Sequence, residues 1–290
     1  MGLDPEVRRR AALLRLDEVL GVDDEAAGPA PRDPPAPPLR GALDAAVVLL
    51  ATLYLGVRHS LTDCLTTPLG REQLARQVVE VGRRGVPIVV GVTFLIGAII
   101  AIQTAYTLEP YGATIYVARG VGISMTRELG PLMAAVLVAA RSGSAIAAEL
   151  GSMVVSEEVE ALEMMALRPR RFLLSPRFAA LTFSVPALSV CADVAGVLGG
   201  AAIMVLQYDI VARAYFDETV RAVYLSDIGS GLIKSVFFGA LIAAVACRCG
   251  LSLRGGPEAV GRAATAAVVQ SIVAVVLFDA AFTFASRGIL

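Results

Sequence analysis

Five long runs of apolar residues, separated by short polar segments, occupy the chain from residue 86 onward. A bilayer core about 30 Å thick requires roughly 20 apolar residues in an α-helix, and each run reaches that length. The pattern predicts membrane-spanning helices at about 86–108, 128–151, 178–206, 228–249 and 259–284. The fold class is therefore predicted to be all-α integral membrane.

The segment before the first span has a different pattern. Residues 43–57 are apolar but short for a crossing, and the charged Arg58 and Asp63 follow them. Residues 72–84 place Leu74, Val78 and Val81 at helical spacing opposite their charges. Such one-sided patterns favour helices that lie along a membrane surface. We expect interfacial or elbow helices over 43–85.

The first 40 residues are expected to be a cytoplasmic tail. They include the proline-rich stretch GPAPRDPPAPP at 28–38, which favours an extended linker. The charged start lacks the uninterrupted apolar core and cleavage site of a secretory signal. The remainder, residues 41–290, is predicted to form one membrane domain.

Composition supports a chain that resides in lipid and excludes several classes of site. Hydrophobic residues make up 56% and charged residues 18%, with a mean hydropathy of +0.71. The net charge of −1 provides no basic face for nucleic acid. Cys247 and Cys249 lack the further cysteines or histidines of a zinc site, and the lone His59 lies outside the spans. No phosphate-binding loop is present, so we expect no catalytic residue, no metal and no cofactor bound by this chain.

The arginines predict the orientation, because positive charge in short loops stays cytoplasmic. With the N-terminus inside, the inside segments hold Arg71, Arg76, Arg83, Arg84, Arg168, Arg170, Arg171, Arg177, Arg248, Arg254 and Arg262. The outside loops hold only Arg119, Arg127, Arg213 and Arg221. We therefore expect a cytoplasmic N-terminus and a C-terminus on the opposite side.

The longest inside loop, residues 152–177, carries a short amphipathic pattern. Ser156 is a suitable helix cap, acidic residues occupy the first turn, and one face is apolar, with Val159, Leu162, Met165 and Ala166. The spacing predicts a helix over about 156–166. Lying on the bilayer is one interpretation, but its glutamates would then face anionic lipid. A groove on a partner protein is the favoured one.

Charged residues inside the predicted spans are costly unless they are paired or hydrated. They are Arg141, Glu149, Asp193, Lys234 and Asp279. Arg141 and Glu149 are about two helical turns apart and share a face. A structural ion-pair network and a role in transport both remain open for each of them.

Glu128 lies at the predicted outer end of the second span. It is a candidate contact for an amphiphilic substrate, although an acid at a helix N-terminus is also ordinary. The accompanying wall would comprise Ile100, Tyr106, Leu108, Tyr111 and Leu129. Its tyrosines are equally well explained as anchors at the membrane interface.

Several longer motifs together are specific to one family. They are Arg127-Glu128-Leu129-Gly130-Pro131, LVAARSGSAIAAELGSM at 137–153, EEVEALEMMALRPRRFLLSPR at 157–177, Ile233-Lys234-Ser235 with FFGALIA at 237–243, and AVGRAATAAVVQS at 259–271 with Asp279. In this order the chain closely resembles the MlaE/YrbE permeases of MCE-type lipid transporters. The resemblance covers roughly residues 70–286, without the proline-rich start.

The resemblance implies a homodimeric permease of the bacterial inner membrane. Its implied partners are a cytoplasmic ABC ATPase, which would bind ATP and Mg²⁺, and a periplasmic MCE-domain protein. The implied substrate is a lipid that is moved between the inner membrane and the periplasm or outer membrane. The sequence motifs are most similar to those of the phospholipid branch of the family. The short helix would be the coupling helix that contacts the ATPase through Glu157, Glu158, Glu160, Ala161, Leu162, Glu163, Met164 and Met165.

Two other classes remain open from the residues alone. An ion-coupled secondary carrier would need intramembrane acids such as Asp193 and Asp279, although no internal repeat is evident. A scaffold that anchors other proteins without transport is the second.

Overall fold

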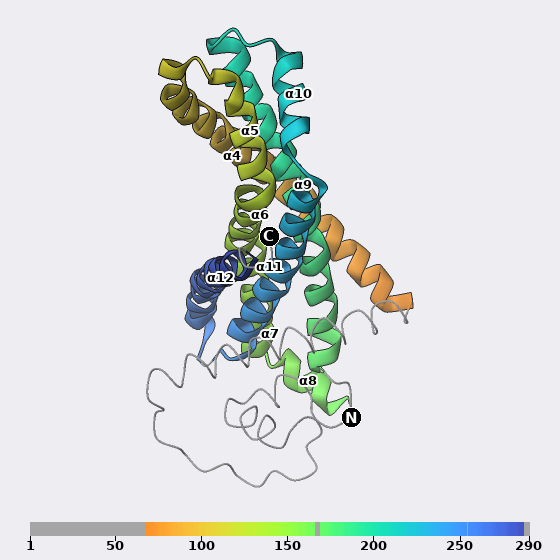
Figure 1. Ribbon diagram of the computed structural model, residues 1–290. Helices are drawn as coiled ribbons and strands as arrows, with labels where there is room; N and C mark the ends of the chain where they lie inside the picture. Colours follow the sequence, from red (N-terminus) through yellow and green to blue (C-terminus); the bar gives the residue numbers. More distant parts are fainter. Residues whose placement is uncertain (1–67, 166–168, 254, 287–290) are drawn as a thin grey trace.

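The computed structural model describes residues 68–165, 169–253 and 255–286 (Figure 1). The predicted tail over 1–40 and the interfacial segment 43–57 lie outside these residues. The described chain is helical, with no strand in it, and five of its helical runs are long and apolar enough to cross a membrane. The predicted all-α membrane fold is confirmed.

The helices follow one another in a simple up-and-down order. Four runs are single or near-continuous helices: α4 Pro68–Leu108, α9 Pro169–Gln207, α11 Leu225–Leu251 and α12 Pro257–Ser286. The second run is composite, with α5 Val117–Ser124, α6 Gly130–Val138 and α7 Ser144–Val155. Shorter connecting elements are η1 Glu109–Tyr111, η2 Thr114–Tyr116, α8 Glu158–Met164 and α10 Ala212–Ala222. In Figure 1, α8 lies at one end of the bundle and α5 with α10 at the other.

The first run differs from its predicted division into an elbow and a span. Residues 72–84 are continuous with the span in α4, whose 41 residues correspond to about 60 Å of helix. Pro87 lies inside this helix and removes one backbone donor. The Arg141 guanidinium donates to the carbonyl oxygen of Arg84 just before it. The first and second runs are therefore connected just before the proline.

The second run begins earlier than residue 128 and contains two π-helical segments. These are η3 Met125–Leu129 and η4 Ala139–Gly143. A π segment inserts an extra residue, so it rotates the face presented by the helix that follows. Accordingly α6 packs on α9, whereas α7, beyond η4, packs on α11 and α12.

Glycines allow α4 and α9 to cross in backbone contact. A Cβ at Gly97 would overlap the carbonyl oxygen of Gly196, and one at Gly199 would overlap that of Phe94. Close approach through small residues is how helices associate in lipid, where apolar burial gives no net drive. The longest helix pair of the bundle is therefore fixed by contacts that a methyl group would remove.

Two apolar clusters lie on either side of this crossing. The larger one, toward α8, includes Leu181, Phe238 and Leu241, and α11 runs through its centre. The most apolar window of α11 is 72% buried, against 17% for α12, so α12 is peripheral. The smaller cluster joins α4, α5, α9 and α10 around Met204 and Tyr215. Burial raises the pKa of Tyr215 to about 12, which keeps this hydroxyl neutral.

A matched pair of alanine substitutions tests the crossing of α4 and α9. Gly97→Ala is expected to destabilise the bundle by about 1–3 kcal/mol, because its methyl group overpacks the contact with α9. Gly91→Ala, on the same helix with open space around it, should change stability by no more than about 1 kcal/mol, in the stabilising direction. Unfolding by SDS titration in mixed micelles measures both. Equal stabilities of the two variants would contradict the backbone crossing.

Candidate functional site

The most concentrated polar chemistry within the described part of the chain surrounds the ammonium group of Lys234. This side chain projects from α11 and is only 2% exposed. Its Nζ donates to Glu128 Oε2 at 2.5 Å and to Thr283 Oγ1 at 2.8 Å. Asp279 Oδ1 is 3.0 Å from the same nitrogen. We call Glu128, Lys234, Asp279 and Thr283 the polar cluster.

The polar cluster joins segments that are far apart in the sequence. Glu128 comes from the π segment η3, Lys234 from α11, and Asp279 and Thr283 from successive turns of α12. The Thr283 hydroxyl is also 3.2 Å from Glu128 Oε1, and the ring of Phe282 lies 5.5 Å from Lys234 Nζ. The peripheral helix α12 is thus held to the bundle by polar contacts.

Two carboxylates share one ammonium group, so the polar cluster carries a formal charge of −1. Glu128 is also the most accessible of the three charged residues, with its side chain 32% exposed, against 16% for Asp279. Such an arrangement can bind a cationic or hydrogen-bonding group that approaches from the surface.

The residues predicted to form a wall with Glu128 do not gather around it. Ile100, Leu108 and Leu129 are partly buried and pack against the smaller apolar cluster. Tyr106 and Tyr111 are 78% and 81% exposed and face outward. The predicted lipid-contacting wall is therefore divided between an inward-facing and an outward-facing group.

The predicted intramembrane charges fall into four separate places. Lys234 and Asp279 meet in the polar cluster. Arg141 contacts α4, and Glu149 forms an ion pair of 2.8 Å with Arg177 of α9. Asp193 packs against Gly130, where a Cβ would overlap its carboxylate, and its Oδ1 is buried without a hydrogen-bond partner among the described residues.

Sequence reasoning missed Arg177 and Thr283 as partners. Arg177 was assigned to the inside loop, but α9 begins at Pro169, so Arg177 lies two turns inside a helix and is buried. Thr283 gave no signal, because a threonine in an apolar run normally bonds to its own helix backbone. The one available sign was its spacing of one turn from Asp279.

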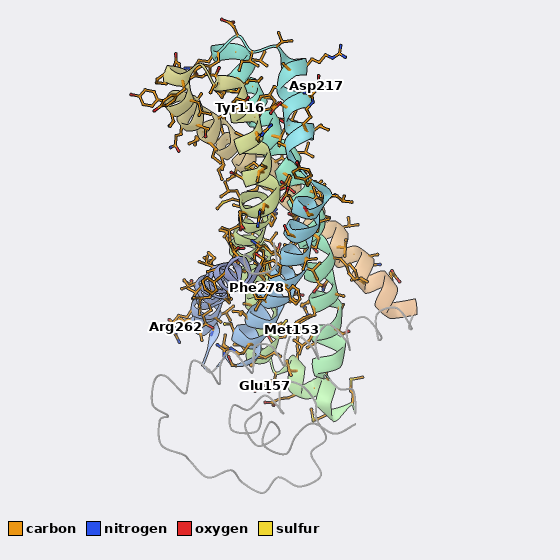
Figure 2. The ribbon with its side chains drawn as sticks, viewed as in Figure 1. Tyr116, Met153, Glu157, Asp217, Arg262 and Phe278 are labelled. Atoms are coloured by element: carbon orange, nitrogen blue, oxygen red, sulfur yellow. The ribbon has the colours of Figure 1, made fainter. Side chains whose placement is uncertain are left out.

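The short helix α8 is observed at Glu158–Met164, within the predicted range 156–166. Ser156 ends α7 instead of capping α8, and Glu157, labelled in Figure 2, takes a left-handed conformation with φ 58° at the turn. The predicted apolar face is split. Val159 and Leu162 pack inward on the larger cluster, whereas Met165 of the predicted face is 70% exposed, and Ala166 lies outside the described residues. Met164 beside them is 84% exposed.

The outer surface of α8 is acidic and apolar together. Glu157, Glu158, Glu160 and Ala161 are exposed beside the two methionines. Leu162, also predicted to contact a partner, is partly buried and packs against the larger cluster of its own chain. The exposed residues form one continuous turn-and-helix surface, which we call the α8 surface.

Comparison with known proteins identifies related membrane proteins. The family model described as Permease MlaE matches residues 74–285. A probable ABC transporter permease protein of Rickettsia typhi is 34% identical over 218 residues, covering 75% of this chain and 84% of the relative. One from Synechocystis is 34% identical over 207 residues, covering 71% and 79%. The chloroplast protein TRIGALACTOSYLDIACYLGLYCEROL 1 of Arabidopsis thaliana is 32% identical over 137 residues, covering 46% and 39%.

The polar cluster predicts a large cost for removing its cation. Lys234→Met leaves two carboxylates facing each other inside the bundle, and we expect a loss of about 3 kcal/mol in unfolding free energy. Arg213→Met, which breaks an exposed ion pair on α10, should change it by less than about 1 kcal/mol. SDS titration in mixed micelles compares the two. A Lys234→Met protein as stable as the control would show that the contacts of Lys234 do not hold α12.

Proposed function

This chain belongs to the MlaE permease family, and from that premise we propose that it moves lipids, specifically phospholipids, between the inner membrane and the periplasm or outer membrane. It is a multi-pass membrane protein and the permease subunit of an ABC transporter, and it is not itself catalytic. Permeases of this type work with an ATPase and other subunits.

The proposed assembly contains two copies of this chain, a cytoplasmic ABC ATPase and a periplasmic MCE-domain protein. The ATPase binds ATP and Mg²⁺, since this chain has no phosphate-binding loop of its own. The membrane is the bacterial inner membrane, with the N-terminus cytoplasmic and the C-terminus periplasmic. The distribution of arginines between the two sets of loops supports this orientation.

The α8 surface is the observation that carries the proposal. A helix of seven residues between two spans is held from behind by Val159 and Leu162 and exposes acids and methionines in front. Methionine is suited to adaptable protein contacts, and exposed acids favour a partner with a basic groove. A displacement of α8 would reach the bundle directly, because its inner side chains belong to the larger apolar cluster.

A lipid as substrate is supported by the character of the bundle. Large apolar side chains are exposed along α4, α9, α11 and α12, such as Leu95, Val194, Ile233 and Leu277. The name of the Arabidopsis relative contains that of a galactolipid. Glu128 is a partly exposed acid in the polar cluster, and we expect the headgroup of an amphiphile to contact it.

An ion-coupled carrier is the second candidate, and the polar cluster is the observation that favours it. Intramembrane acids paired with a lysine occur in proton and ion pathways. The two functions differ in their energy source. Transfer driven by ATP and insensitive to a dissipated proton gradient supports the ABC transporter, and the reverse supports the carrier.

The assembly is tested by purifying the tagged full-length chain from its native membrane in mild detergent. Mass spectrometry of the proteins and lipids is expected to find an ABC ATPase, an MCE-domain protein and enriched phospholipid. A stable complex with neither protein would overturn the proposed assembly.

The α8 surface is tested by a double substitution. Glu160→Ala with Met164→Ala is expected to reduce the amount of copurified ATPase by roughly tenfold, because an acid and an exposed anchor are both removed. Stability should stay within about 0.5 kcal/mol of wild type, as is usual for surface changes. Val220→Ala, an equally exposed apolar change on α10 at the other end, is the control and should leave the ATPase bound. Full ATPase recovery with the double variant would exclude α8 as the contact.

A further inference from the structure

The ion pair between Glu149 and Arg177 bridges two helices whose backbones make little direct contact with each other. Glu149 lies near the end of α7 and Arg177 near the start of α9, and their side chains meet at 2.8 Å. The backbone of α7 packs on α11 and α12, whereas α9 packs on α4, α6 and α11. Both helices thus pack on α11, and at the α8 end the ion pair also connects them directly.

The same two helices carry α8 between them. The chain leaves α7 at Val155, turns at Ser156 and Glu157 into α8, and enters α9 at Pro169. Glu149 lies about two turns before the exit and Arg177 about two turns after the entry. The ion pair therefore ties the two supports of α8 together on the bundle side of that helix.

The environment of Arg177 makes the connection specific. Its side chain is only 6% exposed, and Nη1 donates to the carbonyl oxygen of Leu173 at 2.7 Å, which fixes the guanidinium on α9. Its Nε is buried and has no hydrogen-bond partner among the described residues. Glu149 is 60% exposed, so the acid reaches inward from a surface position to a cation that is held in place.

An ion pair with one buried partner, like this one, adds little net stability compared with apolar residues of the same volume. Stability alone therefore does not account for a guanidinium placed between Leu173 and Phe178, which are both buried in the larger cluster. What the pair supplies is a directional link between two helices whose backbones make little direct contact with each other.

We propose that Glu149 and Arg177 form a clamp that makes α7 and α9 move as one body when α8 is displaced. Both are positioning residues that act through α8 and touch no substrate. The clamp rests on the proposed function in one respect, that a partner displaces α8. With the clamp closed, a displacement of α8 moves α7 and α9 together. With it open, α7 and α9 separate at this end and the displacement is lost between them.

The clamp itself is tested on the full-length chain alone, in lipid nanodiscs. Spin labels are placed at Ser152 on α7 and Phe183 on α9, both exposed, in a background without native cysteines. Electron paramagnetic resonance then gives the distribution of distances between them. Glu149→Gln and Arg177→Met are expected to broaden this distribution and shift it to longer distances, and Arg177→Lys, which keeps the charge, to restore it. An unchanged distribution in both charge-removing variants overturns the clamp.

The link to transport is tested in the reconstituted complex with its ATPase. The vesicles contain phosphatidylethanolamine and phosphatidylglycerol, with fluorescent phosphatidylethanolamine as the probe. Glu149→Gln and Arg177→Met should retain ATPase binding and hydrolysis, while lipid moved per ATP falls roughly tenfold, within the usual range of coupling between sites. Arg177→Lys should retain most of the wild-type amount of lipid moved per ATP. Asp217→Asn, which breaks the exposed α10 pair with Arg213, is the control (Figure 2).

The outcomes separate the clamp from the proposed function. Lipid moved per ATP at the wild-type level in both charge-removing variants overturns the role in coupling, as does loss of ATPase binding, which would assign the pair to shaping the α8 surface. If the wild-type complex shows no ATP-dependent lipid transfer, the proposed function is refuted instead. The distance distributions then still decide whether the clamp exists.

Discussion

A polar group inside a bilayer has no water to bond with, and the structure is organised around that constraint. Lys234 is the clearest case, because its ammonium group is almost fully buried in the central helix α11. Its partners come from η3 and from α12, the least buried of the five spans. Neutralising one charge therefore determines where the last helix lies and how the π segment of the second run is oriented.

The same constraint explains why helices are joined by small residues in some places and by long charged residues in others. Where α4 and α9 cross, Gly97 and Gly199 bring backbones together and no side chain intervenes. Where helices diverge, the distance is bridged by Arg141 reaching α4 and by Glu149 meeting Arg177. Apolar burial cannot do either task alone, since lipid tails solvate leucine as well as another helix does.

The hydrophobic pattern was sufficient for the fold class and the five spans, because the length of an apolar run is a local property. It located the C-terminal ends of α4 and α9 but not their starts, which extend beyond the apolar runs into charged sequence that still favours a helix. The π segments were also beyond reach. Nothing in Met125–Leu129 or Ala139–Gly143 differs in composition from an ordinary α-helix, and only tertiary packing selects the extra residue.

For the site, the sequence indicated Glu128, Lys234 and Asp279 one by one but not as a group. Their partnership depends on which faces of three helices meet, and a rotation of one residue, about 100° in an α-helix, would separate them. The prediction for α8 had the same weakness. Its apolar residues suggested one face, yet Val159 and Leu162 face the bundle while Met164 and Met165 do not, because the left-handed turn at Glu157 sets the rotation of the whole helix.

The polar cluster and the pair of Glu149 and Arg177 lie at different levels along the bundle, and they restrict the movement of helices to different degrees. The polar cluster joins η3, α11 and α12 through several contacts to a single buried lysine, so separating those helices would strand charge in lipid. The pair of Glu149 and Arg177 has one partner on an exposed position, and the acid can be rehydrated if the helices part. Of these two connections, the one at the α8 end is therefore the one that a relative movement of helices can break at lower cost, and it lies at the end where α8 exposes its surface.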